Sequence, residues 1–277
     1  MSKRYTDEFL EEVYNYMQKT GKGICAVARH FDVCQSTLSK RLKEKYDDTI
    51  IRKNGKLKVD SNYFKVIDNE HKAYWLGFLT ADGYLCPQKN RLDLRLAEVD
   101  KKHIELFKED IKSEHKISPS QSELYGKKFI SYGITIQDKE ISNDLVKLGF
   151  TSDKSHDANI PFNKIPKDLL RHYIRGLMDG DGSVMKINKG RGVGAVICTT
   201  VSCQLIDDIT RCIKDEININ VKYRISKVKN PIDICIYKQE EADKFFDWIY
   251  KDSTIYLDRK YEKYAVLRQG CKKSQNN

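Results

Sequence analysis

Two short segments of this chain are almost alike, and the second begins 99 residues after the first. The first is Trp75-Leu-Gly-Phe-Leu-Thr-Ala-Asp-Gly83, and the second is Ile174-Arg-Gly-Leu-Met-Asp-Gly-Asp-Gly182. Each ends in Asp-Gly after a small residue, and glycine is the residue favoured just past a helix C-terminus. We therefore predict two equivalent helices in a chain that contains an internal repeat.

Each predicted helix carries a narrow stripe of small residues four positions apart: Gly77 and Ala81 in the first, Gly176 and Gly180 in the second. Such stripes let two helix backbones pack closely. Close packing would bring Asp82 and Asp181 together at the helix ends, where carboxylates repel each other and the helix dipole. Divalent cations relieve that repulsion, and hard oxygen ligands suit Mg²⁺. A metal pair of this kind suits attack on phosphodiesters. A single Asp-Gly after a helix would be only a turn signal.

The segments that follow the two motifs match in order. Alternating Leu92, Leu94 and Leu96 predict a half-buried strand after the first motif. Further elements are expected at 100–112 (helix), 129–136 (strands) and 139–148 (helix). After the second motif they are expected at 183–200 (strands), 202–214 (helix), 221–226 and 232–237 (strands), and 240–250 (helix). Both halves are thus α+β, in the order helix-strand-strand-helix-strand-strand-helix.

The outer faces of the predicted strands are basic. Polar residues alternate with apolar ones at Arg91 and Arg95 in the first half, and at Lys222 and Arg224 in the second. A single strand of this kind is usually a solvated sheet face. Two pseudo-symmetric faces could form a saddle for a DNA duplex, and the net charge of +10 is compatible with a polyanionic partner.

A lysine follows the last predicted helix of each half. Lys154 follows Asp82 at nearly the same separation along the chain as Lys260 follows Asp181. Because the chain has 50 lysines and arginines, either lysine alone could be ordinary surface charge. The similar register instead suggests that both stabilise charge developing on phosphorus or help to activate water.

Residues 5–45 predict three short helices that resemble a helix-turn-helix DNA reader. Its base-facing candidates are Gln35, Ser36, Thr37 and Ser39, and its phosphate-facing candidates are Lys40 and Arg41. A generic three-helix cap is the alternative. Eight basic residues between positions 40 and 58 indicate a basic linker along a phosphate backbone.

The remaining sequence features concern the cellular compartment. The eight cysteines form no C-x-x-C pair, which argues against a zinc ribbon or a thioredoxin-type centre. No apolar signal region or membrane-length apolar run is present. We expect no membrane partner and a cytoplasmic location, in a bacterial or phage-host cell.

Through the two motifs and the two lysines, residues 70–265 resemble the LAGLIDADG homing endonucleases in their single-chain, two-motif form. The resemblance implies a monomer of two αββαββα repeats whose sheets read the major groove. It implies metal ligands at Asp82 and Asp181, with the carbonyls of Ala81 and Gly180 as further ligands, and active-site lysines at Lys154 and Lys260. Thr80 departs from the family pattern, since it stands where an earlier, structural acid is usual. Leu76 and Arg175 depart too, since they fill a place that is often small.

We therefore expect five segments: a helix-turn-helix domain (1–46), a basic linker (47–69), two repeats (70–158 and 159–268) and a polar tail (269–277). The expected function is a site-specific endonuclease that breaks double-stranded DNA with Mg²⁺ or Mn²⁺. Two alternatives share the fold: a DNA-binding transcription regulator without cleavage, and an RNA-splicing maturase with intron RNA as its partner. Regulators of this type tend to lose the motif acids, and both acids are present here.

Overall fold

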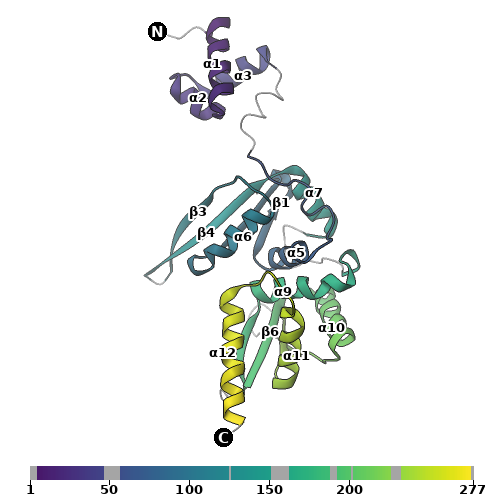
Figure 1. Ribbon diagram of the computed structural model, residues 1–277. Coiled ribbons are helices and arrows are strands. Elements are labelled where there is room, and N and C mark those ends of the chain that lie inside the picture. Colours follow the sequence, from purple (N-terminus) through teal and green to yellow (C-terminus); the bar gives the residue numbers. More distant parts are fainter. Residues whose placement is uncertain are drawn as a thin grey trace. The chain divides into compact units, whose positions relative to one another are not determined.

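The computed structural model describes residues 5–46, 57–124, 126–150, 162–187, 192–200, 202–225 and 232–275 (Figure 1). The chain divides into two compact units, residues 1–58 and 59–277. Among the described residues, no helix is both long enough and apolar enough to cross a membrane.

The first unit is the predicted three-helix cluster of α1 (Asp7–Thr20), α2 (Ile24–His30) and α3 (Gln35–Lys45). Thr6 caps α1 by accepting the Phe9 N–H at 3.2 Å. Asp32 adopts a left-handed conformation, with φ at 50°, in the turn before α3. Val13, Val27, Leu38 and Leu42 are fully buried between the helices. The three helices predicted within residues 5–45 are therefore present.

The second unit starts with the first repeat. Its elements are α5 (Glu70–Asp82), β1 (Gly83–Cys86), β2 (Arg91–Ala97), α6 (Lys101–Asp110), β3 (Ile117–Leu124), β4 (Lys127–Gln137) and α7 (Lys139–Leu148), with short 3₁₀ turns at Pro87–Lys89 and Glu98–Asp100. The strands form an antiparallel sheet in the order β1-β2-β4-β3. Leu92, Leu94 and Leu96 are buried on its inner face, as their alternation predicted. Gly149 ends α7 with a φ of 105°, which only glycine adopts readily.

The second repeat follows the same plan. Its elements are α9 (Leu170–Gly180), β5 (Ser183–Ile187), β6 (Gly192–Thr200), α10 (Cys203–Ile217), β7 (Lys222–Ile225), β8 (Ile232–Ile236), α11 (Gln239–Tyr250) and α12 (Asp258–Gln275), preceded by 3₁₀ turns at Phe162–Lys164 and Lys167–Leu169. The strand order β5-β6-β8-β7 repeats that of the first sheet. The expected αββαββα order is therefore present twice.

The structure corrects the expectation for the C-terminal residues. Positions 269–275 are not a separate polar tail but the last part of α12, a helix that packs along β5 and β6. In Figure 1 this is the yellow helix. Its sequence is too polar to show an apolar stripe, and burial of Tyr264 at 4% exposure anchors it. Within the expected linker, Phe64 and Ile67 also pack into the core of the second unit.

Candidate active site at the paired helices

The two motif helices, α5 and α9, lie against each other with their backbones in contact. A Cβ atom built on Gly77 would lie 2.0 Å from the carbonyl oxygen of Tyr173. One built on Gly176 would lie 2.1 Å from the carbonyl oxygen of Tyr74. These two contacts join equivalent positions of the two motifs, so the helices cross about a pseudo-two-fold axis. Only glycine permits this separation at either position.

Asp82 is the last residue of α5, and Asp181 is the first residue beyond α9. A Cβ atom on Gly180 would lie 2.3 Å from the Ala81 Cβ and 3.4 Å from the Asp82 Oδ2. The carboxylate of Asp82 therefore lies against the end of α9, directly before Asp181. Both aspartates are exposed, while Ala81 and Gly180 are half-buried.

The motif glycines serve close packing rather than a left-handed helix end. Gly83 is extended, with φ at −72° and ψ at 159°. A Cβ atom there would lie 2.8 Å from the Leu79 carbonyl oxygen. At Gly182 it would lie 2.5 Å from the carbonyl oxygen of Ile197, on β6. The first strand of each repeat thus starts where the chain fits tightly beside its motif helix.

Lys260, in the first turn of α12, lies against the end of α9. Its side chain is buried, and its Nζ donates to the carbonyl oxygens of Met178 at 2.9 Å, Gly180 at 2.7 Å and Gly182 at 2.7 Å. Burial lowers the pKa of this ammonium to about 8, while the charges of Asp179, Asp82 and Asp181 oppose that shift. The lysine therefore satisfies carbonyls that the helix end leaves without partners.

A second acid of the second motif, Asp179, is fully buried and was not a predicted site residue. Its carboxylate accepts hydrogen bonds from Tyr74 Oη at 3.0 Å, Tyr250 Oη at 3.0 Å and the Leu257 N–H at 2.8 Å. Burial raises its pKa to about 6, although these donors favour the charged form. Asp179 thus joins α5, α9, α11 and the start of α12.

Thr80 occupies the equivalent position in the first motif. Its hydroxyl donates to the Leu76 carbonyl at 2.7 Å and accepts from Tyr173 Oη at 3.3 Å. Tyr173 and Tyr74 occupy equivalent positions in the two repeats. The hydrogen bond from Tyr173 to Thr80 therefore corresponds to that from Tyr74 to Asp179, but Thr80 carries no charge. Aligning the two motifs in the sequence already shows this Thr-for-Asp difference.

The donors at the helix ends fit a hard divalent cation. They are two exposed carboxylates, from Asp82 and Asp181, next to the main-chain carbonyl of Ala81, while the Gly180 carbonyl already accepts Lys260 Nζ at 2.7 Å. In the described part of the chain, no group of three or more His, Cys, Asp or Glu side chains could hold a metal ion. Mg²⁺ needs no such cage, because it retains several waters and takes one or two carboxylates plus substrate phosphates.

The predicted DNA-facing residues of the second unit lie on both sheets. Arg91 Nε lies 2.8 Å from Asp93 Oδ2, and Arg95 donates to Ser131 Oγ at 3.4 Å. Lys222 is exposed, and Arg224 Nε donates to Asp233 Oδ2 at 2.8 Å. The outward arginines are therefore held in place by neighbouring polar groups. Lys154 lies outside the described residues.

In the first unit, the candidates lie on α3. Gln35, Ser36, Thr37 and Lys40 are exposed, and Ser39 is half-buried. Arg41 is exposed and pairs with Glu44 at 3.1 Å. Leu38 and Leu42, on the same helix, are buried.

Comparisons with known proteins agree with this architecture. Residues 168–250 match the family model of the LAGLIDADG-like domain. The structure is similar to that of the homing endonuclease I-WcaI bound to its DNA recognition sequence, with a TM-score of 0.54 and 13% identity, over 78% of this chain and 93% of that one. The predicted LAGLIDADG resemblance and the two-repeat fold are thereby confirmed.

Two further proteins are similar. Full-length DUF199/WhiA from Thermatoga maritima aligns with a TM-score of 0.44 and 15% identity, over 76% of this chain and 64% of that one. The replication factor C small subunit of Methanocaldococcus jannaschii is 25% identical over 216 residues, which are 69% of this chain and 11% of that protein. The chain thus spans about a tenth of the length of this relative.

Proposed function

We propose that this protein is a site-specific endonuclease that breaks double-stranded DNA by metal-dependent hydrolysis of phosphodiesters. The observation that carries the proposal is the pairing of α5 and α9, which sets the Asp82 carboxylate against the end of α9, where Asp181 follows. Two carboxylates at neighbouring helix C-termini repel each other and the helix dipoles, and a bound divalent cation would relieve that repulsion.

Each repeat would serve the cleavage of one strand. Asp82, Asp181 and the carbonyl of Ala81 would hold Mg²⁺ or Mn²⁺, whereas the Gly180 carbonyl, the further ligand that the sequence suggested, accepts the Lys260 ammonium at 2.7 Å. The bound cation supplies Lewis acidity that activates water and neutralises charge on the phosphate. The ammonium of Lys260, fixed by three carbonyls, adds positive charge beside the same carboxylates. Lys154 would serve the first repeat in the same way.

The two sheets and α3 would supply DNA binding. Arg91, Arg95, Lys222 and Arg224 lie on strands of the two sheets, and the net charge of the chain is +10. I-WcaI, which shares the fold, was solved on its DNA recognition sequence. Arginines oriented by Asp93, Ser131 and Asp233 are suited to contacts with base edges and phosphates. α3 would act as the recognition helix of a helix-turn-helix.

Cleavage of the DNA that flanks the gene of this protein tests the proposal, with and without Mg²⁺. Asp82→Asn and Asp181→Asn should each abolish double-strand cutting and leave DNA binding largely intact. Asp168→Asn is the matched control. It removes an exposed carboxylate of the second repeat, the repeat of Asp181, at a position away from the Asp-Gly ends of the motif helices. Full cutting by either motif variant would contradict the assignment.

The same experiment separates the alternatives. Tight, sequence-specific DNA binding by the wild-type chain with no cutting in Mg²⁺ or Mn²⁺ would indicate a transcription regulator. Tight binding of intron RNA in preference to DNA would indicate a maturase.

A further inference from the structure

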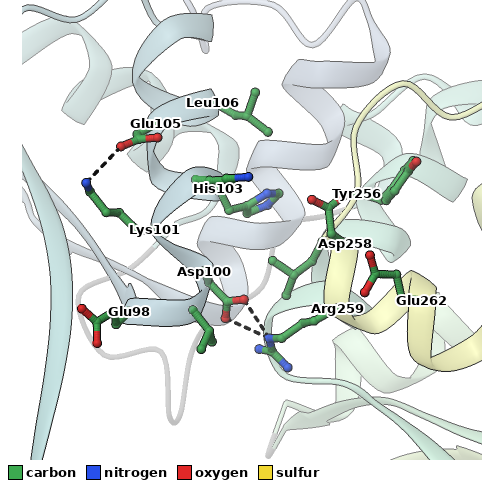
Figure 2. Close-up of a pocket in the computed structure, with 13 residues that line it drawn as sticks. Glu98, Asp100, Lys101, His103, Glu105, Leu106, Tyr256, Asp258, Arg259 and Glu262 are labelled. Atoms are coloured by element: carbon green, nitrogen blue, oxygen red, sulfur yellow. Dashed lines mark hydrogen bonds and ion pairs between the residues drawn. The ribbon is translucent and has the colours of Figure 1, made fainter.

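The first turn of α12 is tied to the first repeat by one ion pair. Arg259 Nε donates to both carboxylate oxygens of Asp100, at 2.8 and 2.9 Å. Asp100 ends the short 3₁₀ turn after β2 and is only 6% exposed. Figure 2 shows the two side chains meeting across the junction of the repeats.

The pair lies at the edge of a cavity of about 560 Å³ between the starts of α6 and α12. Val99, next to Asp100, is 80% exposed. The cavity wall is mostly charged, as Figure 2 shows for Glu98, Asp258 and Glu262. The Asp100–Arg259 pair joins this turn to α12 at the cavity edge.

Arg259 directly precedes Lys260, so its pair acts on the backbone that carries the lysine. The Lys260 N–H donates to the Leu257 carbonyl at 2.9 Å, and the Leu257 N–H donates to the buried Asp179 at 2.8 Å. One carboxylate from the second repeat, Asp179, and one from the first, Asp100, thus hold the same helical turn. The Lys260 ammonium is then fixed at its far end by the carbonyls of Met178, Gly180 and Gly182.

We propose that Asp100 and Arg259 are positioning residues that make the placement of Lys260 depend on the first repeat. The strand cut served by Lys260 then requires both repeats to be docked. This inference rests on the proposed nuclease function for its catalytic consequence, but not for the placement of the lysine.

Strand-resolved cleavage tests the consequence. With each strand of the target labelled separately, Asp100→Asn and Arg259→Gln should slow the cutting of one strand about tenfold or more, because small misplacements of catalytic groups are costly. The other strand should be cut at the wild-type rate, so nicked DNA accumulates. If the residues act as a pair, the double variant is no slower than either single variant.

Arg268→Gln is the matched control. Arg268 lies on the same helix, but its guanidinium pairs with Asp247 of α11, within the second repeat. It should cut both strands at wild-type rates. If Asp100→Asn does not fold, Arg259→Lys replaces it, with a smaller slowing of the same strand. Equal slowing of both strands would indicate general destabilisation and overturn the inference.

Lysine labelling gives a readout that needs no nuclease activity. An amine-reactive acylating reagent, with mass-spectrometric detection and no DNA, should modify Lys260 faster in Asp100→Asn and Arg259→Gln than in the wild type or Arg268→Gln. Unchanged labelling would refute the positioning role and leave the nuclease proposal intact. Increased labelling in a protein that cuts no DNA would support the positioning role and count against the nuclease proposal alone.

Discussion

Replacing Gly176 with alanine tests whether backbone contact between α5 and α9 holds the molecule together. The new methyl group would lie 2.1 Å from the Tyr74 carbonyl oxygen and 2.6 Å from the Phe78 backbone nitrogen. Ordinary contact at such a position begins at 3.4 Å, so more than a third of a normal contact distance is missing and the helices must move apart. Both obstacles are main-chain atoms, so no side-chain rotation can relieve the clash.

Overpacking of a well-packed interior costs about 1–3 kcal/mol. We expect Gly176→Ala to lower the free energy of unfolding by about 3 kcal/mol, at the upper end of that range, because separation also weakens the dispersion contacts along both helices. Gly77→Ala should behave alike, since its methyl group would meet the Tyr173 carbonyl at 2.0 Å. The Gly77→Ala/Gly176→Ala double variant should lose less free energy of unfolding than the two single variants together, because one separation of the helices accommodates both methyl groups.

Urea unfolding followed by tryptophan fluorescence measures this effect. The two tryptophans, Trp75 and Trp248, are both in the second unit, so the signal reports that unit alone. Val266→Ala is the control, because it changes a residue of the second unit that is 66% exposed, so the same signal reports its stability. The contact argument would be refuted by a Gly176→Ala stability within about 0.5 kcal/mol of the wild type, the range of ordinary surface substitutions. Strict additivity in the double variant would refute it as well.

Three further predictions concern stability. Burial lowers the pKa of His103 from 6.5 to about 4, so neutral His103 stabilises the fold above pH 6.5 and this stabilisation is lost as the pH falls toward 4. Acid unfolding curves should show a loss of up to about 3 kcal/mol in the free energy of unfolding, and His103→Gln should make that free energy less dependent on pH. Asp179→Ala leaves three buried hydrogen-bond donors without an acceptor and should lower the free energy of unfolding by about 3 kcal/mol or more. Thr80→Ala should lower it by about 1 kcal/mol, and urea unfolding of the two variants compares these values directly. Leu38→Ala should destabilise the first unit by about 2–5 kcal/mol, seen as faster hydrogen exchange in α1–α3 with an unchanged tryptophan transition.

The sequence by itself determined the order of the elements, because its signals are local or repeated, although one of the two strands expected at 129–136 lies at Ile117–Leu124 instead. The apolar spacing of Leu38 and Leu42, the alternation of Leu92 and Leu94, and the cap at Thr6 each act within a few residues. The small residues of the motifs predicted the contact of two distant helices, because a backbone-to-backbone fit depends only on the absence of side chains.

The tertiary structure alone decided how the lysine and the buried acids are used. The sequence predicted Lys260 as a group near phosphate, but its ammonium binds three carbonyls of the second motif segment. Asp179 and the Asp100–Arg259 pair depend on partners 78 and 159 residues away. Such contacts produce no periodic pattern in the sequence, because each depends on the direction of a single side chain after the two repeats have docked.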